Sequence, residues 1–323
     1  MHETLAMGGA FAGVNNVHPL GLAALAAGCV AVVAVRRALV PVAFLCVAAF
    51  VPSAQRVVVA GADFNFIRLL VVAGMLRVLL RREIAAVAWN WFDAAALSGA
   101  LLRIGGYFAS RGDGGALVTA IGSNFEIVGS YVVFRSCIRD RGDVEGVLRG
   151  AAVVAMLAAP FFVLESSTGR NLFSVFGGVP ETTMLREGRL RCQGAIAHPI
   201  LAGCFFATFT GLWIAQAVAR PGRDRLLAAG GLVAAATITF CCASSTPVVA
   251  FLQAAVAWAF LPMRRWLRFA WGALAVVAMV LHVAMNKPVW FLIARIDAVG
   301  GSTGWHRSHL IDGAVRHVGE WWL

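Results

Sequence analysis

The chain has 323 residues, of which 60% are hydrophobic and 13% are charged, and its mean hydropathy is +0.80. A soluble domain of this length cannot expose so much apolar surface to water, so the composition predicts an integral membrane protein. The formal net charge of +11 comes from arginines clustered between apolar segments, and this distribution argues against nucleic acid as a partner.

Ten apolar segments are long enough, or nearly so, to cross about 30 Å of hydrocarbon as helices. Their residue ranges are 20–35, 38–52, 66–80, 92–108, 116–134, 147–164, 195–219, 226–243, 247–262 and 269–285. The sequence therefore predicts an all-α fold, a polytopic membrane helix bundle. In this interpretation residues 1–285 form one transmembrane helical domain, and residues 286–323 form a segment outside the membrane.

Arginine placement predicts the orientation of the bundle, because short cytoplasmic loops retain positive charge. Every second connection holds a cluster of arginines, and we expect these connections to face the cytoplasm. The clusters are Arg36 and Arg37; Arg77, Arg81 and Arg82; Arg135, Arg139 and Arg141; Arg220, Arg223 and Arg225; and Arg264, Arg265 and Arg268. The N-terminus, the connection 165–194 and the tail from Asn286 then lie on the outer, periplasmic face of the cytoplasmic (inner) membrane.

The connection 165–194 departs from this rule, because it carries arginines on the outer face. It holds Arg170 and, immediately before the seventh apolar segment, Arg186, Arg189 and Arg191. Guanidinium groups bind phosphate through paired, planar hydrogen bonds, and beside a bilayer the most available anion is the headgroup of a lipid-linked substrate. The alternative is that these arginines only anchor a loop at the headgroup layer. Their position on the outer face favours a site for a lipid phosphate or diphosphate.

The tail 286–323 contains a helical pattern after a turn at Gly300, Gly301 and Gly304. The apolar face of this pattern consists of Leu310, Ile311, Ala314, Val315, Val318, Trp321 and Trp322. The polar face consists of His306, His309, Gly313, Arg316, His317 and Glu320. Residues spaced in this way predict an amphipathic helix on the outer membrane surface.

Three motifs in this order carry a resemblance to a known family. They are Arg191-Cys192-Gln193-Gly194 followed by His198-Pro199-Ile200-Leu201-Ala202-Gly203, then Ser244-Ser245-Thr246-Pro247, and finally Ser302-Thr303-Gly304 leading into Arg307 and Leu310. Together they resemble the O-antigen ligase and O-antigen polymerase superfamily. The similarity covers most of the chain, from about Pro19 through the tail.

The resemblance implies a membrane glycosyltransferase of polysaccharide biosynthesis in the cell envelope. Such proteins bind an undecaprenyl-diphosphate-linked glycan at their outer loops and transfer it, with inversion and without a metal or other cofactor, to a sugar or glycolipid acceptor. By that resemblance Arg191 matches the arginine that holds the donor diphosphate, and Arg307 matches the arginine of the later outer loop. We add Arg186, Arg189 and His198 to the predicted diphosphate site because they are close in sequence. Membrane lipid is the remaining expected partner.

Transfer to an acceptor hydroxyl also requires a general base with a pKa near neutrality, for which histidine is suited. The candidates are His306, His309 and His317. In the family, however, the expected histidine lies beyond a glycine-containing segment that would follow Leu323. The resemblance thus implies a longer protein, and we expect residues 1–323 alone to bind the glycan weakly or not at all and not to transfer it.

Two other functions remain open at this stage. The chain can be a transporter or exporter of an amphipathic anion, although it lacks the related halves expected of many transporters, and Glu126 is its only ionisable candidate near mid-membrane. It can also be a subunit of an envelope assembly with no activity of its own.

Several local patterns have a plainer interpretation than a functional site. The histidines of the tail can be read with Glu320 as a zinc site, but a polar interfacial helix explains them equally well. For Asn124 and Glu126 we favour a hydrogen bond between helices or a position near the interface. The run Ser244-Ser245-Thr246 is interpreted as a helix cap before Pro247.

Overall fold

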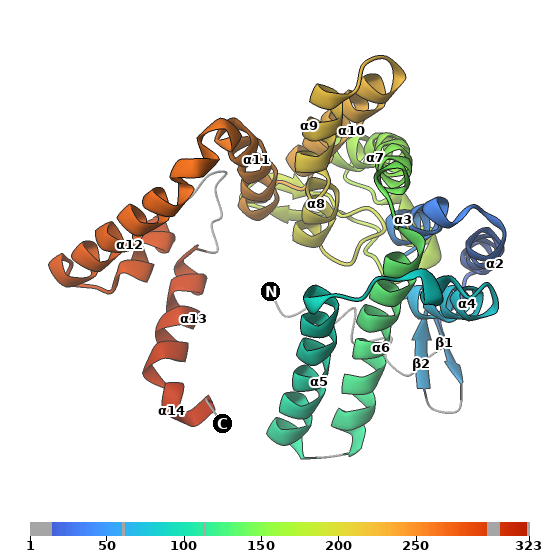
Figure 1. The fold of residues 1–323 in the computed structure, drawn as a ribbon, viewed down its shortest axis with the longest axis horizontal. Coiled ribbons are helices and arrows are strands. Elements are labelled where there is room, and N and C mark those ends of the chain that lie inside the picture. Colours follow the sequence, from blue (N-terminus) through green and yellow to red (C-terminus); the bar gives the residue numbers. More distant parts are fainter. Residues whose placement is uncertain (1–14, 60–61, 113, 296–303, 322–323) are drawn as a thin grey trace.

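The computed structural model describes residues 15–59, 62–112, 114–295 and 304–321 (Figure 1), and most of them are helical. The first six helices are α2 (Pro19–Ala34), α3 (Val40–Phe50), α4 (Phe66–Leu80), α5 (Trp91–Arg111), α6 (Gly114–Cys137) and α7 (Arg141–Thr168). The others are α8 (Pro199–Ala207), α9 (Thr210–Ala219), α10 (Arg223–Cys241), α11 (Ser245–Ala259), α12 (Leu267–Ala284), α13 (Gly304–Arg316) and α14 (Val318–Trp321).

Short elements connect these helices. The 3-10 turns are η1 (Arg37–Leu39), η2 (Glu83–Ala86), η3 (Leu172–Phe176), η4 (Leu261–Trp266) and η5 (Val289–Arg295). Two antiparallel hairpins are present, β1 (Arg56–Val59) with β2 (Ala62–Asn65) and β3 (Met184–Arg186) with β4 (Arg189–Arg191). The hairpins are small, so the all-α prediction is confirmed.

Each of the ten predicted apolar segments coincides with helix in the described residues. Five helical stretches are long and apolar enough to cross a membrane, namely Leu117–Cys137, Arg141–Thr168, Pro199–Ala219, Arg223–Cys241 and Leu261–Ala284. Three shorter apolar helices occupy Pro19–Ala34, Arg37–Phe50 and Ser245–Ala259. The structure is therefore that of a helical protein with several helices suited to a membrane.

The seventh apolar segment differs in detail from its prediction as one helix over 195–219. Helix begins only at Pro199, and a turn at Thr208 and Phe209 separates α8 from α9. The hydroxyl of Thr208 donates back to the carbonyl oxygens of Cys204 and Phe205. This back-bonding competes with the regular helical pattern, and it accounts for an interruption that hydropathy does not reveal.

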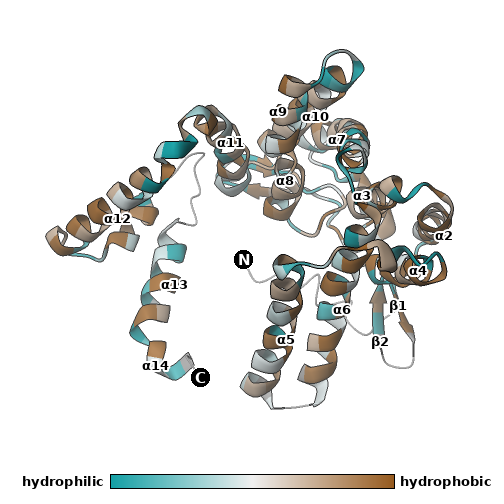
Figure 2. Cartoon of the chain, in the orientation of Figure 1, coloured by the Kyte–Doolittle hydropathy of each residue, from teal (hydrophilic) through white to brown (hydrophobic). Residues whose placement is uncertain are grey.

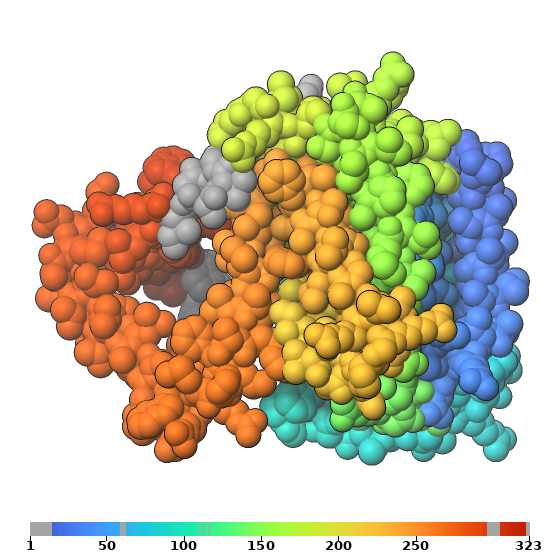
Figure 3. Space-filling view, turned by 90° about the horizontal axis from the view of Figure 1, so that it is seen from above, coloured from blue at the N-terminus to red at the C-terminus, as the bar shows by residue number. Residues whose placement is uncertain are grey.

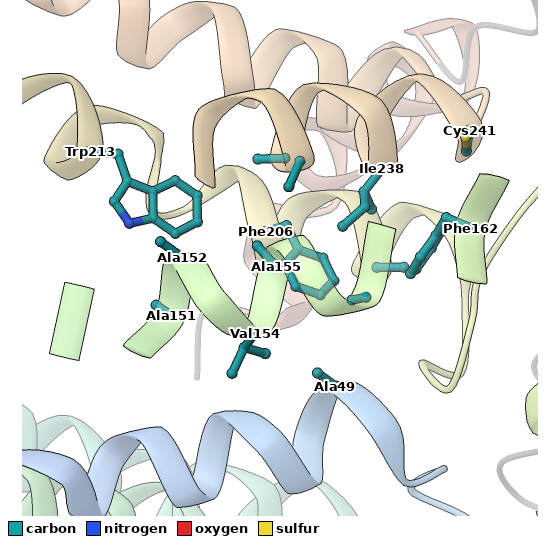
Figure 4. Close-up of a cluster of buried hydrophobic side chains, with 14 of the residues drawn as sticks. Ala49, Ala151, Ala152, Val154, Ala155, Phe162, Phe206, Trp213, Ile238 and Cys241 are labelled. Atoms are coloured by element: carbon teal, nitrogen blue, oxygen red, sulfur yellow. The ribbon is translucent and has the colours of Figure 1, made fainter. Parts of the chain in front are cut away.

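Two apolar clusters form the core of the bundle. The first lies between α7, α8, α9 and α10, where the Trp213 ring is fully buried and its Nε1 donates to the carbonyl oxygen of Leu148 over 3.0 Å (Figure 4). Gly231 lets α10 approach closely, because a Cβ there would lie 2.9 Å from the Trp213 ring. The second cluster joins α2, α3, α4 and α6 around residues such as Phe44, Leu70 and Val133.

Ion pairs gather the predicted cytoplasmic connections at one end of the bundle, which we call the arginine-rich end. The contacts are Arg37 with Asp140 and Asp143, Arg77 with Glu83, Arg149 with Asp224, and Arg220 with Glu145. The opposite end of α7 carries Glu165, which binds the backbone of Gln193 and Gly194 shortly after Arg191, and we call it the Arg191 end. From Asp143 to Glu165 the rise of α7 is about 33 Å, which is close to the thickness of the hydrocarbon layer.

The C-terminal helices extend to one side of the remaining bundle (Figure 3). No residue in the apolar window of α12 is buried within the chain, and much of this helix is brown in Figure 2. The predicted tail helix is present as α13 and α14. The predicted turn residues Gly300 and Gly301, the motif residues Ser302 and Thr303, and Trp322 lie outside the described residues.

The separation of the two ends generates a topology prediction. A cysteine introduced by Glu181→Cys, at the Arg191 end, is expected to react with a membrane-impermeant maleimide in intact cells. A cysteine introduced by Pro221→Cys, at the arginine-rich end, is expected to react only after permeabilisation, because arginine-rich loops remain in the cytoplasm. The unsubstituted chain controls for its own cysteines. The reverse labelling pattern would contradict the predicted orientation.

Candidate functional site

The arginine cluster before α8 lies on the β3–β4 hairpin. Its register pairs Met184 with Arg191 and Arg186 with Arg189. Side chains alternate along a strand and directly paired residues share a face, so Arg186, Arg189 and Arg191 all lie on one face of the hairpin. The turn residues Glu187 and Gly188 have φ values of +52° and +74°, as in the tight turns that match the twist of a hairpin.

A buried carboxylate at the end of α7 holds the base of this hairpin. Glu165 is 2% exposed, and its two oxygens accept hydrogen bonds from the backbone N–H groups of Gln193 (3.1 Å) and Gly194 (2.9 Å). It also accepts a bond from the hydroxyl of Thr183 (3.3 Å), just before β3. Glu165 therefore fixes the chain on both sides of the hairpin.

Further contacts close the same loop. The Asn171 side chain donates to the carbonyl oxygen of Gly194 over 2.8 Å, and the backbone N–H of Cys192 donates to the carbonyl oxygen of Cys241 over 3.1 Å. Gly194 has a φ of +59°, and a Cβ there would lie 2.9 Å from the ring of Phe162. The residue after Gln193 therefore has to be glycine, and the loop is fastened to the ends of α7 and α10.

Arg191 is the most unusual side chain of this region. It is only 5% exposed, yet its Nε is buried without a hydrogen-bond partner. Burial lowers the pKa of the Arg191 guanidinium, and the nearby charge of Arg186 lowers it further. The charge of Glu187 in the hairpin turn acts on this guanidinium, but no carboxylate forms an ion pair with it among the described residues. A buried cation with a free donor is costly unless an anion pairs with it, so the geometry is suited to an anionic ligand.

The tail contributes a second arginine to this end of the bundle. Arg307 of α13 donates to the hydroxyl of Thr246 over 2.6 Å, and its charge also lies near Cys204 of α8. Thr246 belongs to the first turn of α11, and α11 packs closely on α8, where a Cβ at Gly203 would lie 2.5 Å from Pro247. The same Cβ would lie 3.4 Å from the Cys242 sulfur, which is near Arg191. Arg191 and Arg307 thus both lie near the packed start of α8 and α11.

The first turn of α11 differs from the predicted cap. Ser244 occupies the cap position and is 6% exposed, but its side chain makes no capping hydrogen bond. The backbone N–H groups at this helix start therefore lack their usual side-chain acceptor, and the positive end of the helix dipole is left uncompensated beside Arg307.

The predicted histidines are distributed between two environments. His198 caps α8, since its Nδ1 accepts from the backbone N–H of Ile200 over 3.1 Å, and Arg191 is close enough for its charge to act on the ring. His306, His309 and His317 are exposed on α13 or just after it. His309 contacts the carbonyl oxygen of Trp305, and His317 contacts Glu320. Within the described ranges, no group of three or more His, Cys, Asp or Glu residues is arranged to hold a metal ion.

Some polar residues have roles that the sequence patterns did not reveal. Glu165 was recognisable only as the boundary of a long connection, and its partners are up to 29 residues away along the chain. The expected interhelical hydrogen bond of Glu126 is confirmed, because it accepts from Asn65 and Arg68 at the start of α4. Asn124 does not take part in it and donates instead to the carbonyl oxygen of Ala120 in its own helix.

Comparison with known proteins identifies no relative of this chain. No protein-family model matches the chain, and neither curated proteins nor solved structures show a significant similarity to it. The function is therefore argued from the site itself.

The environment of His198 generates a pH prediction. Burial lowers the pKa of His198, and the positive charge of Arg191 lowers it further. The unfolded chain takes up a proton at this residue below about pH 6.5, whereas the folded chain resists it. The resulting contribution to stability is therefore present above about pH 6.5 and is lost as the pH falls through the lowered value.

This prediction can be measured with His198→Asn, because asparagine also caps helices but does not titrate. The thermal midpoint of the original chain in detergent is expected to fall more between about pH 7.5 and about pH 5.5 than that of the variant. The other histidines are common to both proteins. An identical pH dependence of the two midpoints would contradict the prediction.

Proposed function

We propose that this protein is a membrane glycosyltransferase of the O-antigen ligase or polymerase type, which binds the diphosphate of a polyprenyl-linked glycan beside Arg191. The observation that carries the proposal is the buried Arg191 guanidinium, whose Nε has no partner. A phosphate oxygen can accept from this donor and offset the cost of burying the charge. The ten-pass topology and the periplasmic position of the site belong to the same proposal.

The surrounding charges support a diphosphate more than a single small anion. Arg186 and Arg189 share the hairpin face of Arg191, and Arg307 reaches the start of α11 from the tail. In this proposal Arg191 and Arg307 each bind one of the two phosphate groups. The uncapped start of α11 adds N–H donors oriented towards an anion.

The chemistry of transfer follows from this arrangement. The acceptor hydroxyl attacks the anomeric carbon of the donor sugar, the bond to the diphosphate oxygen breaks, and negative charge develops on the departing phosphate. Guanidinium groups fixed by the fold stabilise that charge without having to reorganise during the reaction. His306, His309 and His317 are the proposed candidates for removing the acceptor proton, because they are exposed on the helix that carries Arg307 or just after it.

The proposal predicts that Arg191→Lys weakens donor binding although the positive charge is kept. A lysine cannot reproduce the planar two-point contact of a guanidinium with a phosphate. We expect the affinity for a short-chain polyprenyl diphosphate carrying a fluorescent sugar to fall about tenfold or more, as the loss of one charge-assisted hydrogen bond implies. The measurement is equilibrium binding to the purified protein in nanodiscs.

Arg170→Lys is the matched control, because Arg170 lies in the same connection but is exposed, with only a distant ion pair to Glu181 at 4.0 Å. Its affinity is expected to stay within about twofold of the original chain. Equal tolerance of lysine at both positions would favour simple anchoring of the loop and would overturn the proposed role of Arg191.

A further inference from the structure

A second basic site lies at the arginine-rich end, far from Arg191. It is a cavity of about 500 Å³ between the α2–α3 connection, the end of α4 and the start of α7. Its lining residues are Arg36, Arg37, Ala38, Arg77, Arg81, Glu83, Gly142 and Asp143. Figure 2 shows the hydrophilic connection between α2 and α3 beside largely apolar helices.

Two of the four arginines are already neutralised. Arg77 is almost completely buried; it pairs with Glu83 and also donates to the carbonyl oxygens of Val32 and Val35, each over 2.7 Å. Arg37 donates to Asp143 from both Nε and Nη2, over 3.2 and 3.0 Å. These contacts hold α2, α4 and α7 together and give the cavity rigid walls.

The remaining two arginines have no carboxylate partner among the described residues. Arg81 donates only to the carbonyl oxygen of Val33, over 2.8 Å, and the exposed side chain of Arg36 makes no hydrogen bond or ion pair within the described part of the chain. Four arginines face two carboxylates in the lining, so the cavity retains a net positive charge. Two guanidinium groups beside a preformed cavity are a binding site for phosphate.

The apolar surroundings indicate that this phosphate belongs to a lipid. Leu39, Leu79 and Leu80 are 42%, 60% and 74% exposed, and each lies within two residues of a cavity arginine along the chain. The cavity also lies at the end of α7, a helix long and apolar enough to span the membrane. A free phosphate ion would leave these leucine side chains exposed, whereas the acyl chains of a phospholipid would cover them.

We propose that this cavity binds the phosphate group of an anionic phospholipid through Arg36 and Arg81, with the acyl chains lying along the exposed leucines. The site is independent of the proposed glycan site, from which the length of α7 separates it. It would stabilise the contacts between α2, α4 and α7 whenever the adjacent leaflet contains anionic lipid.

The test uses the full chain purified in detergent. Retention of phosphatidylglycerol is compared with that of phosphatidylcholine by native mass spectrometry, and the thermal midpoint is recorded with each lipid and with inorganic phosphate alone. The test variants are Arg36→Gln and the double variant Arg36→Gln/Arg81→Gln. Arg36→Gln removes a guanidinium group that makes no hydrogen bond or ion pair within the described part of the chain. The matched control is Arg265→Gln/Arg268→Gln, which removes the same charge from η4 and the first turn of α12, outside the cavity.

We expect the original chain to retain phosphatidylglycerol selectively, and the double variant to bind it about tenfold or more weakly, in line with about 1 kcal/mol for each basic residue near an anionic surface. The single variant is expected to lose part of this affinity and the control none. Equal loss in the control would show diffuse interfacial attraction and overturn the site. An equal thermal shift from inorganic phosphate and from the lipid would overturn the lipid assignment.

Discussion

The hydrogen bonds from Gln193 and Gly194 to the Glu165 carboxylate hold together the part of the chain that carries Arg191. Because Glu165 sits in the last turns of α7, these bonds transfer the rigidity of the longest helix to a loop that would otherwise be mobile. The carboxylate is used by backbone donors, so it does not neutralise Arg191. The fold thus buries the Arg191 guanidinium without an ion-pair partner among the described residues, and an anionic ligand can supply that partner.

Charge has opposite uses at the two ends of the bundle. At the arginine-rich end, several guanidinium groups bind carboxylates of other connections or helices, for example Arg149 with Asp224 and Arg220 with Glu145. These pairs fasten the ends of α7, α9 and α10, and their unpaired neighbours remain free for the lipid surface. At the Arg191 end fewer arginines are present, and the fold isolates one of them instead of pairing it. The paired arginines of the arginine-rich end therefore hold helices together, whereas Arg191 is available to a ligand.

Sequence reasoning was most successful where structure depends on local composition. Hydropathy located every helical segment of the bundle, and the spacing of apolar residues after Trp305 predicted α13 and α14. Sequence patterns could not predict the hydrogen bond between Glu165 and the backbone of Gln193, close to Arg191. The two residues are 28 positions apart, and only the packed fold brings them together. The sequence also predicted a helix cap at Ser244. It did not predict that the Ser244 side chain makes no capping hydrogen bond. The contact of Arg307 with Thr246 was not predicted either, because the two residues are 61 positions apart and their contact depends on how α13 packs.

The most direct test of the account is a cryo-electron microscopy map of the chain in nanodiscs, with a bound antibody fragment as a fiducial and a saturating short-chain polyprenyl diphosphate. We expect diphosphate density beside the β3–β4 hairpin, with a phosphate oxygen about 3 Å from the Nε of Arg191. The Glu165 contacts with Gln193 and Gly194 should be unchanged in that map. Diphosphate density at another position, with the Nε of Arg191 still buried and unpaired, would contradict the central claim that this arginine is the anchor of the donor site.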